Sequence, residues 1–243
     1  MRLVVFDMDG TLIDSVALIV ETVAAAFGSV GEAVPDERTI RSISGLTLNI
    51  ALQRLAPGAD ADRLELLTAR YRNEYVARRQ GREVLFPGAL AALDRLRADP
   101  NTVLAIGTGK ASRSARRVLA SHGIEEYFSS IQTPDDNPSK PHPQMILSAI
   151  AAAGGTARET VMIGDTNHDM EMARAAGVPA IGVAGAITRL PNFWPPAPIW
   201  CSTNSINSTP PSTHFWSNRC GISSRTPISI GKKVTGGPRH RAG

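Results

Sequence analysis

The chain has 243 residues, of which 42% are hydrophobic and 20% charged, as is typical of a folded globular protein. It contains no apolar run of about 18 residues, and the first ten residues, MRLVVFDMDG, already include acids, so we expect neither a transmembrane helix nor a signal peptide and place the protein in the cytoplasm. The net charge of +4 is unevenly spread: all 22 acids lie in residues 1–185, and residues 186–243 hold seven basic residues and no acid. That basic segment shows no helical or strand period, so its charge does not predict nucleic-acid binding.

The first predicted element is a buried strand, LVVFDMD at 3–9, where a short apolar run ends in acids. The following segment, up to residue 81, has helical spacing and no strand pattern. Gly45 and the APGA sequence at 56–59 interrupt it. The helices expected in this segment cover 14–27, 36–43, 47–55 and 61–79.

Strands and helices alternate in the rest of the chain, up to residue 185. The expected strands cover 102–108, 128–133, 160–165 and 179–184. The expected helices cover 88–99, 112–123, 141–155 and 167–177. Such alternation predicts an α/β fold with a parallel sheet covered on both faces, into which the earlier helices are inserted after the first strand.

Two carboxylates follow the first strand, in the motif DMDGT. Ligands bind where the strands of a parallel sheet end, so Asp7 can act there as a nucleophile and Asp9 as a general acid and base. Gly10 permits the tight turn that such a motif needs. A strand-to-loop junction with solvated acids is an equally good interpretation of this motif alone.

Three other strand ends carry polar residues that suit a phosphate and a metal ion. Asp165 and Asp169, in GDTNHD, suit Mg²⁺, because this hard cation takes oxygen ligands. Thr108 and the backbone N–H groups of GTGK can hold a phosphate oxygen, and Lys140 can neutralise both the phosphate and a nucleophile. Taken singly, Asp165 can instead cap the following helix, and Thr108 can belong to the N-cap region of a helix. Lys140 can be an ordinary solvated lysine. Together they provide the charge cancellation that a carboxylate attacking phosphorus requires.

The order of these motifs resembles the haloacid dehalogenase (HAD) superfamily, specifically its phosphoglycolate-phosphatase-like branch. The resemblance covers residues 1 to about 185 and rests on DMDGTLIDS, the apolar run that ends at Thr108, SKPHP, and MIGDTNHDMEMARAAG. It implies a Rossmann-like core of residues 1–14 and 82–185, with a helical cap at residues 15–81 inserted after the first motif.

The resemblance also implies roles for individual residues. Asp7 would become the aspartyl-phosphate, and Asp9 would protonate the leaving group and then activate water. An acid at position 9 argues for phosphoryl transfer, because a halide leaves without a proton. Gly109 departs from the Asn of many relatives, and we expect this to loosen one hydrogen bond near the phosphate. The implied phosphate-binding residues are Thr108, Gly109 and Lys140, and the implied Mg²⁺ ligands are Asp7, the carbonyl of Asp9 and Asp165, with Asp169 in support.

The predicted function is a Mg²⁺-dependent phosphatase for a small phosphorylated metabolite, with 2-phosphoglycolate favoured, acting as a monomer or weak homodimer without nucleic acid or membrane. The cap would choose the substrate through residues 42–48, and Arg41 and Arg54 are candidates to meet a second anionic group, although each can equally face water. Two alternatives stay open within the superfamily, a sugar-phosphate phosphatase or pyrophosphatase and a phosphoglucomutase. The alternative of another class is an inactive, misfolded remnant.

The chain changes character after Gly185. All three Trp, both Cys and eight of the 17 Pro lie in residues 186–243. One nucleotide restored after codon 184 lets permitted codons encode VAWGYHPVAEFLAAGADLVFHEFDQLH, which has the pattern of a loop, a helix and a short strand. We therefore interpret residues 186–243 as an aberrant, disordered tail translated in a shifted frame, which the gene's nucleotide sequence would decide. A functional basic extension and a divergent packed segment are the alternatives.

Overall fold

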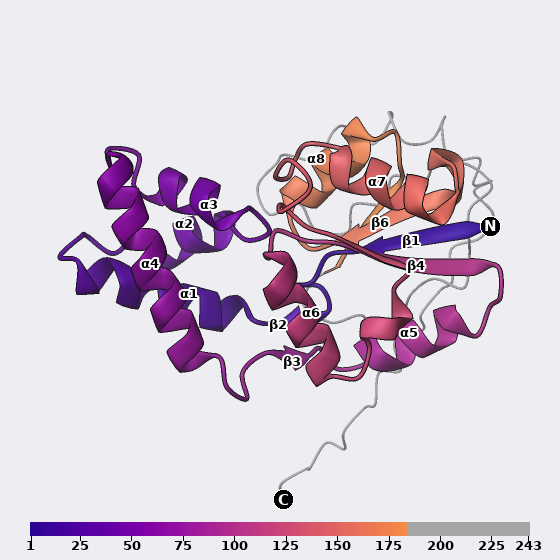
Figure 1. Ribbon diagram of the computed structural model, residues 1–243, viewed down its shortest axis with the longest axis horizontal. Helices are drawn as coiled ribbons and strands as arrows, with labels where there is room; N and C mark the ends of the chain where they lie inside the picture. The colour runs from indigo at the N-terminus through magenta and orange to yellow at the C-terminus, as the bar shows by residue number, and fades with distance from the viewer. Residues whose placement is uncertain (184–243) are drawn as a thin grey trace, which may run out of the picture. The chain divides into compact units, whose positions relative to one another are not determined.

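The computed structural model describes residues 1–183, and the predicted tail and the last two residues of the predicted core lie outside them. The sheet of the described part has five strands, all parallel, in the order β5-β4-β1-β6-β7, of which β4, β1 and β6 are labelled in Figure 1. This confirms the predicted α/β fold. The strands are β1 Arg2–Phe6, β4 Thr102–Gly107, β5 Ser130–Gln132, β6 Thr160–Gly164 and β7 Ala180–Gly182.

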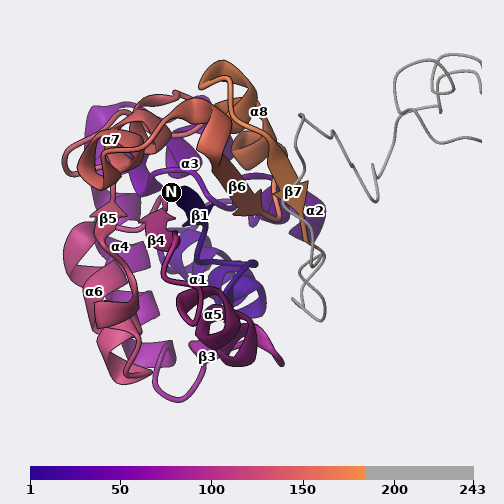
Figure 2. The same ribbon diagram turned by 90° about the vertical axis from the view of Figure 1, so that its right-hand side faces the viewer.

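Helices cover the sheet on both faces, as Figure 2 shows. On β1, Val4 and Phe6 pack in one apolar cluster with α5 and α6, whereas Leu3 and Val5 pack in another with α7 and α8. Apolar side chains therefore point both ways from this central strand, which explains its continuous hydrophobic run. The four helices are α5 Ala89–Arg97, α6 Ser112–Ser121, α7 Gln144–Ala153 and α8 Asn167–Ala175, and 3₁₀ turns occur at Glu125–Tyr127 and Ala157–Glu159.

The predicted cap contains four helices, each within a few residues of its predicted bounds: α1 Val16–Ser29, α2 Glu37–Ser42, α3 Leu48–Leu55 and α4 Ala61–Arg78 (Figure 1). The side chains of Asp36 and Asp60 accept hydrogen bonds from the first turns of α2 and α4 and so mark where these helices begin. All four helices contribute to an apolar cluster of their own, which includes Phe27, Leu52 and Leu67. No described helix is long and apolar enough to cross a bilayer.

A second, two-stranded sheet was not predicted. Its strands, β2 Ile13–Asp14 and β3 Val84–Leu85, pair in antiparallel fashion next to the two predicted junctions between cap and core. Strands of two residues are too short to show a sequence period, which explains the omission. The cap bounds of 15–81 stay a prediction, supported by this pairing and by the cap's separate apolar cluster.

Two adjacent leucines of α4 differ in burial, and substituting them tests whether the cap has an apolar core of its own. Leu67 is fully buried, whereas Leu66 is 38% exposed. We expect Leu67→Ala to lower the free energy of unfolding by about 2–5 kcal/mol, because it leaves a cavity. The matched change Leu66→Ala should cost less than about 1 kcal/mol. Urea unfolding followed by circular dichroism measures both, and equal losses would contradict this packing.

Candidate active site

The predicted site residues leave the sheet at the same edge. In the register of the sheet, Phe6 of β1 pairs with Ile106 of β4 and with Ile163 of β6. The chain therefore continues into Asp7, Thr108 and Asp165 from neighbouring strand ends, although these residues are far apart in sequence. Thr108 is buried, and its backbone N–H donates to Gln132 O at 3.1 Å, which fixes the start of its loop.

Three carboxylates gather at this edge. Each of Asp7, Asp165 and Asp169 offers one oxygen, and these oxygens lie within 4.8 Å of one another. Gly10 makes the arrangement possible, since it has a φ of +82° and a Cβ there would lie 2.1 Å from Asp165 Oδ2. The two acids of GDTNHD and the first acid of DMDGT therefore form one cluster, and Gly10 is needed both for its turn and for its lack of a side chain.

Lys140 lies between two of these acids and is not the solvated lysine of the alternative interpretation. Its side chain is fully buried, and Nζ lies 2.8 Å from Asp7 Oδ1 and 2.7 Å from Asp169 Oδ1. Burial alone would lower the pKa of Lys140, but the charges of Asp169 and Asp7 outweigh burial and raise that pKa above its ordinary value. The site thus holds a permanent positive charge beside the predicted nucleophile.

One ammonium does not balance three carboxylates. Burial raises the pKa of Asp7 well above its ordinary range, Lys140 lowers it, and the charges of Asp169 and Asp165 raise it again. Burial, followed by the charge of Asp169, raises the pKa of Asp165 to about 7. Asp7 Oδ2 is buried and has no hydrogen-bond partner among the described residues. Oxygen ligands, excess negative charge and an unpartnered buried oxygen fit a hard divalent cation.

Helix α8 orients Asp169. Thr166 is the N-cap residue of α8, and its side chain accepts from Asp169 N, while Asp169 Oδ2 accepts from Thr166 N at 3.1 Å and from Thr166 Oγ1 at 2.7 Å. Asp165 is therefore not the helix cap considered in the alternative interpretation. Its Oδ1 instead accepts a hydrogen bond from Thr11 Oγ1 at 2.8 Å.

Asp9 is held through a single oxygen. Ser15 Oγ donates to Asp9 Oδ1, and Lys110 Nζ lies 3.0 Å from the same oxygen. Burial opposes the charge on Lys110, but the charge of Asp9 favours it, and the pKa of Lys110 is raised overall. Sequence analysis missed this contact. Lys110 stands in the quoted GTGK motif, but a sequence does not show which lysine is buried.

The cap reaches the acid cluster through the loop predicted to control specificity. Thr47 N donates to Ser139 Oγ of the core at 3.0 Å. A Cβ built on Gly45 would lie 3.8 Å from Asp7 Oδ2. A Cβ on Gly109 would lie 2.4 Å from Gly45 O and 2.7 Å from Leu46 O. The absent side chain at Gly109 therefore gives room to the backbone of the cap loop.

A cavity of about 880 Å³ lies between cap and core residues, and Asp9, Gly109 and Lys110 are among those that line it. Neither Arg41 nor Arg54 lines this cavity, and Arg41 instead pairs with Glu37 at 2.6 Å. The two arginines predicted to bind a second anionic group of the substrate therefore do not face this cavity, and other arginines do. The arginines that line the cavity are Arg72, Arg79, Arg113 and Arg117.

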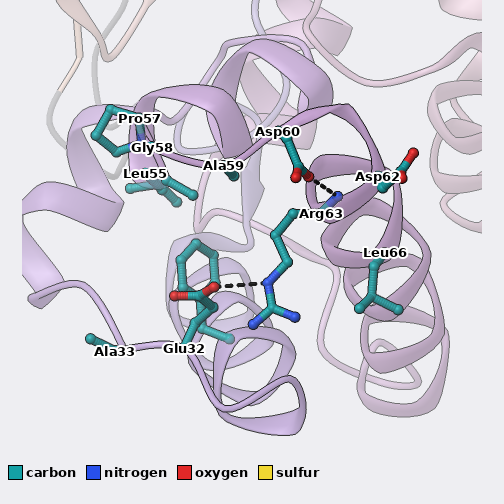
Figure 3. Close-up of a pocket in the computed structure, with 12 residues that line it drawn as sticks. Glu32, Ala33, Leu55, Pro57, Gly58, Ala59, Asp60, Asp62, Arg63 and Leu66 are labelled. Carbon is teal, nitrogen blue, oxygen red and sulfur yellow. Dashed lines mark hydrogen bonds and ion pairs between the residues drawn. The ribbon is translucent and has the colours of Figure 1, made fainter.

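Another cavity, of about 760 Å³, lies within the cap (Figure 3). Arg63 is the one cation among the described residues that line it: its Nε donates to Glu32 at 2.8 Å, and Asp60 accepts from its backbone N–H at 2.9 Å. No residue of the acid cluster lines it. Its described cation is thus already paired and Asp62 adds a further acid, so the cavity beside Asp9 is the better candidate for binding a phosphorylated substrate.

The close approach at Gly109 gives a test. We expect Gly109→Ala to displace the cap loop and to lower kcat/KM for the predicted phosphomonoester hydrolysis by about 10- to 100-fold, as small misplacements in an active site do. The matched control is Gly58→Ala in the cap, where an added Cβ would meet no atom within 4 Å. Steady-state kinetics and circular dichroism measure both variants. Unchanged kinetics in Gly109→Ala would show that the loop does not need this position.

Comparison with known proteins identifies the family. Residues 4–183 match the family model of haloacid dehalogenase-like hydrolases. The chain is 36% identical over 192 residues to the Dickeya dadantii protein named "Probable phosphatase IndB", covering 76% of this chain and 82% of that protein. It is 34% identical over 183 residues to the tyrosine-protein kinase PtkA of Mycobacterium tuberculosis, covering 75% of this chain and 62% of that protein.

A phosphoglycolate phosphatase from Agrobacterium fabrum is 31% identical over 197 residues, which cover 78% of this chain and 83% of that protein. Among solved structures, a hydrolase from Pseudomonas syringae superimposes with a TM-score of 0.69 at 26% identity, covering 76% of this chain and 85% of that chain. The matched region contains the sheet, the inserted helices and all four motifs that meet at the sheet edge. The chain belongs to the haloacid dehalogenase superfamily of hydrolases.

Proposed function

We propose that this protein is a Mg²⁺-dependent phosphatase that hydrolyses a small phosphomonoester, with 2-phosphoglycolate the favoured substrate, through an aspartyl-phosphate intermediate. The observation that carries the proposal is the buried cluster in which Lys140 contacts both Asp7 and Asp169 while Asp165 lies beside them. This geometry supports a role for Asp7 as nucleophile, because its carboxylate lies next to a buried ammonium and to further carboxylate oxygens that would hold a metal ion. Relatives named as phosphatases give independent support.

In the first step, a carboxylate oxygen of Asp7 attacks the phosphorus atom. The bond between phosphorus and the leaving-group oxygen breaks, its electron pair goes to that oxygen, and Asp9 gives the oxygen a proton. Lys140 offsets the repulsion between the Asp7 carboxylate and the anionic phosphoryl group. We assign Thr108 and Gly109 to hold the phosphoryl oxygens, since they lie at the neighbouring strand end.

In the second step, Asp9 is a carboxylate and accepts a proton from the attacking water. The water oxygen bonds to phosphorus, the bond between phosphorus and Asp7 breaks, and its electron pair returns to the Asp7 carboxylate. Inorganic phosphate is released. Asp9 thus serves as acid and then as base, so both steps need one of its oxygens free to face the substrate.

The metal ion would be held by Asp7, the carbonyl of Asp9 and Asp165, with Asp169 supporting them. When bound, it supplies positive charge that stabilises the charge developing on the transferring phosphoryl group. Mg²⁺ is proposed because the donors are carboxylate and carbonyl oxygens, with no nitrogen or sulfur ligand in the cluster.

The cavity supports a substrate with a second anionic group, such as the carboxylate of 2-phosphoglycolate. Arg72, Arg79 and Arg113 line it and form no ion pair with any described residue. A pyrophosphatase, a sugar-phosphate phosphatase and a phosphoglucomutase would use the same core cluster and are the alternatives within the superfamily. Loss of turnover because of the predicted aberrant tail is the alternative outside it.

A substrate panel tests the proposal. We expect hydrolysis of 4-nitrophenyl phosphate and 2-phosphoglycolate in the presence of Mg²⁺ and none after chelation. Asp7→Asn should abolish turnover, with a loss of at least about 10⁴-fold, because it removes the nucleophile. Phosphate release measures the panel, which also contains pyrophosphate and β-glucose 1-phosphate. Turnover that survives Asp7→Asn, or a folded wild-type chain without turnover, would overturn the proposal.

The pKa of Asp165 gives a pH test. Without metal, Asp165 is protonated below about pH 7, and a cation must displace that proton to bind. The affinity for Mg²⁺ should therefore fall as the pH drops below that pKa, by up to about tenfold per pH unit for this one proton. Isothermal titration calorimetry between about pH 5.5 and 8.5 measures this. An affinity that does not change over this range would contradict the assignment of Asp165 as a ligand.

A further inference from the structure

Lys110 connects the core to the cap beside Asp9. It follows Thr108 by two residues, and its side chain is 8% exposed. Its Nζ lies 3.0 Å from Asp9 Oδ1 and donates to Tyr75 Oη at 2.8 Å. Asp9 belongs to the core, whereas Tyr75 lies on α4 of the cap. The same ammonium therefore contacts the predicted acid of the core and a hydroxyl of the cap.

Tyr75 is in turn fixed from its other side. Its hydroxyl donates to Glu83 Oε1 at 2.6 Å, and Glu83 lies on the segment that leads from the cap back to the core. Arg117 of α6 holds Glu83 with an ion pair of 2.7 Å, and His122 Nε2 lies 2.7 Å from the Glu83 backbone carbonyl oxygen. The Tyr75 hydroxyl can reach Lys110 only while α4 stays next to the core.

The two contacts to Asp9 leave its second oxygen available. Ser15 and Lys110 both engage Oδ1, and Oδ2 accepts no hydrogen bond from any described residue. Asp9 also lines the cavity between cap and core. A carboxyl group anchored through one oxygen keeps a defined orientation, and its other oxygen is the one that can carry a proton to a leaving group.

We propose that Lys110 is a positioning residue that orients Asp9 for proton transfer, and that Tyr75 of the cap holds Lys110 in place. This inference rests on the proposed function. It means that proton transfer depends on α4 being seated against the core, so the leaving group is protonated efficiently only when the cap covers the cavity. Lys110 does not touch the reacting atoms and acts through Asp9.

The test compares two leaving groups. The nitrophenolate ion leaves without a proton, whereas the alkoxide from 2-phosphoglycolate, or from the best alkyl phosphate of the panel, needs one. We expect Lys110→Met to lower kcat/KM for the alkyl phosphate by about 100-fold and for 4-nitrophenyl phosphate by less than about threefold. Tyr75→Phe keeps the ring and removes the hydroxyl. It should lower the ratio of kcat/KM for the alkyl phosphate to kcat/KM for 4-nitrophenyl phosphate by about tenfold.

The matched control is Tyr127→Phe. It removes a tyrosine hydroxyl that donates to Asp94 at 2.9 Å, outside the cavity, and should leave the ratio unchanged. If Lys110→Met is poorly folded by circular dichroism, Tyr75→Phe carries the test. Equal loss on both substrates, or an unchanged ratio in Tyr75→Phe, overturns the inference while the phosphatase proposal stands. A folded wild-type chain that hydrolyses neither substrate overturns both.

Discussion

The buried ammonium of Lys140, placed between the carboxylates of Asp7 and Asp169, is the interaction on which the site depends. An isolated charge in such a position would be strongly unfavourable, so each of the three groups requires the others. They come from the end of β1, from the loop after β5 and from the first turn of α8. The parallel sheet order and the seating of α8 against β6 are therefore conditions for charge balance as well as for packing. That balance remains short of positive charge, which a metal ion can supply.

The cap contacts the core near this cluster through polar side chains and backbone atoms. Its helices share an apolar cluster of their own, and it meets the core through hydrogen bonds such as that from Thr47 to Ser139 and through the close approach of its loop to Gly109. Contacts of this kind can be made and broken without exposing an apolar core, as at many interfaces between domains. Lys110 adds a charged contact at the same boundary. The residues expected to choose the substrate and those expected to transfer the proton therefore meet at one cavity.

The core cluster could be predicted from the sequence, because its strand-end residues are each recognised from the apolar run that directly precedes them. Polar residues at the ends of parallel strands converge, and Asp7, Thr108 and Asp165 follow apolar runs of the expected length. The same reasoning proposed Arg41 and Arg54 for a second anion, and the structure brings neither to the cavity. A helical period shows that a residue lies on a helix, but which way that helix faces the core depends on how the whole cap packs. Gly109 shows a similar limit: its departure from a common Asn was expected to affect a hydrogen bond, whereas the structure shows a steric role against Gly45 and Leu46.

By itself, the sequence determined the α/β class, the inserted helices, the order of the motifs and the identity of the acids and of Lys140, because each of these follows from short-range periodicity or from residue type at a strand end. Only the tertiary structure decided that Lys140 is buried between two acids, that Asp9 is held through one oxygen, and that Lys110 joins it to Tyr75. These are contacts between segments separated by tens of residues. Burial and charge pairing arise only when those segments meet, and no local pattern in the chain encodes them.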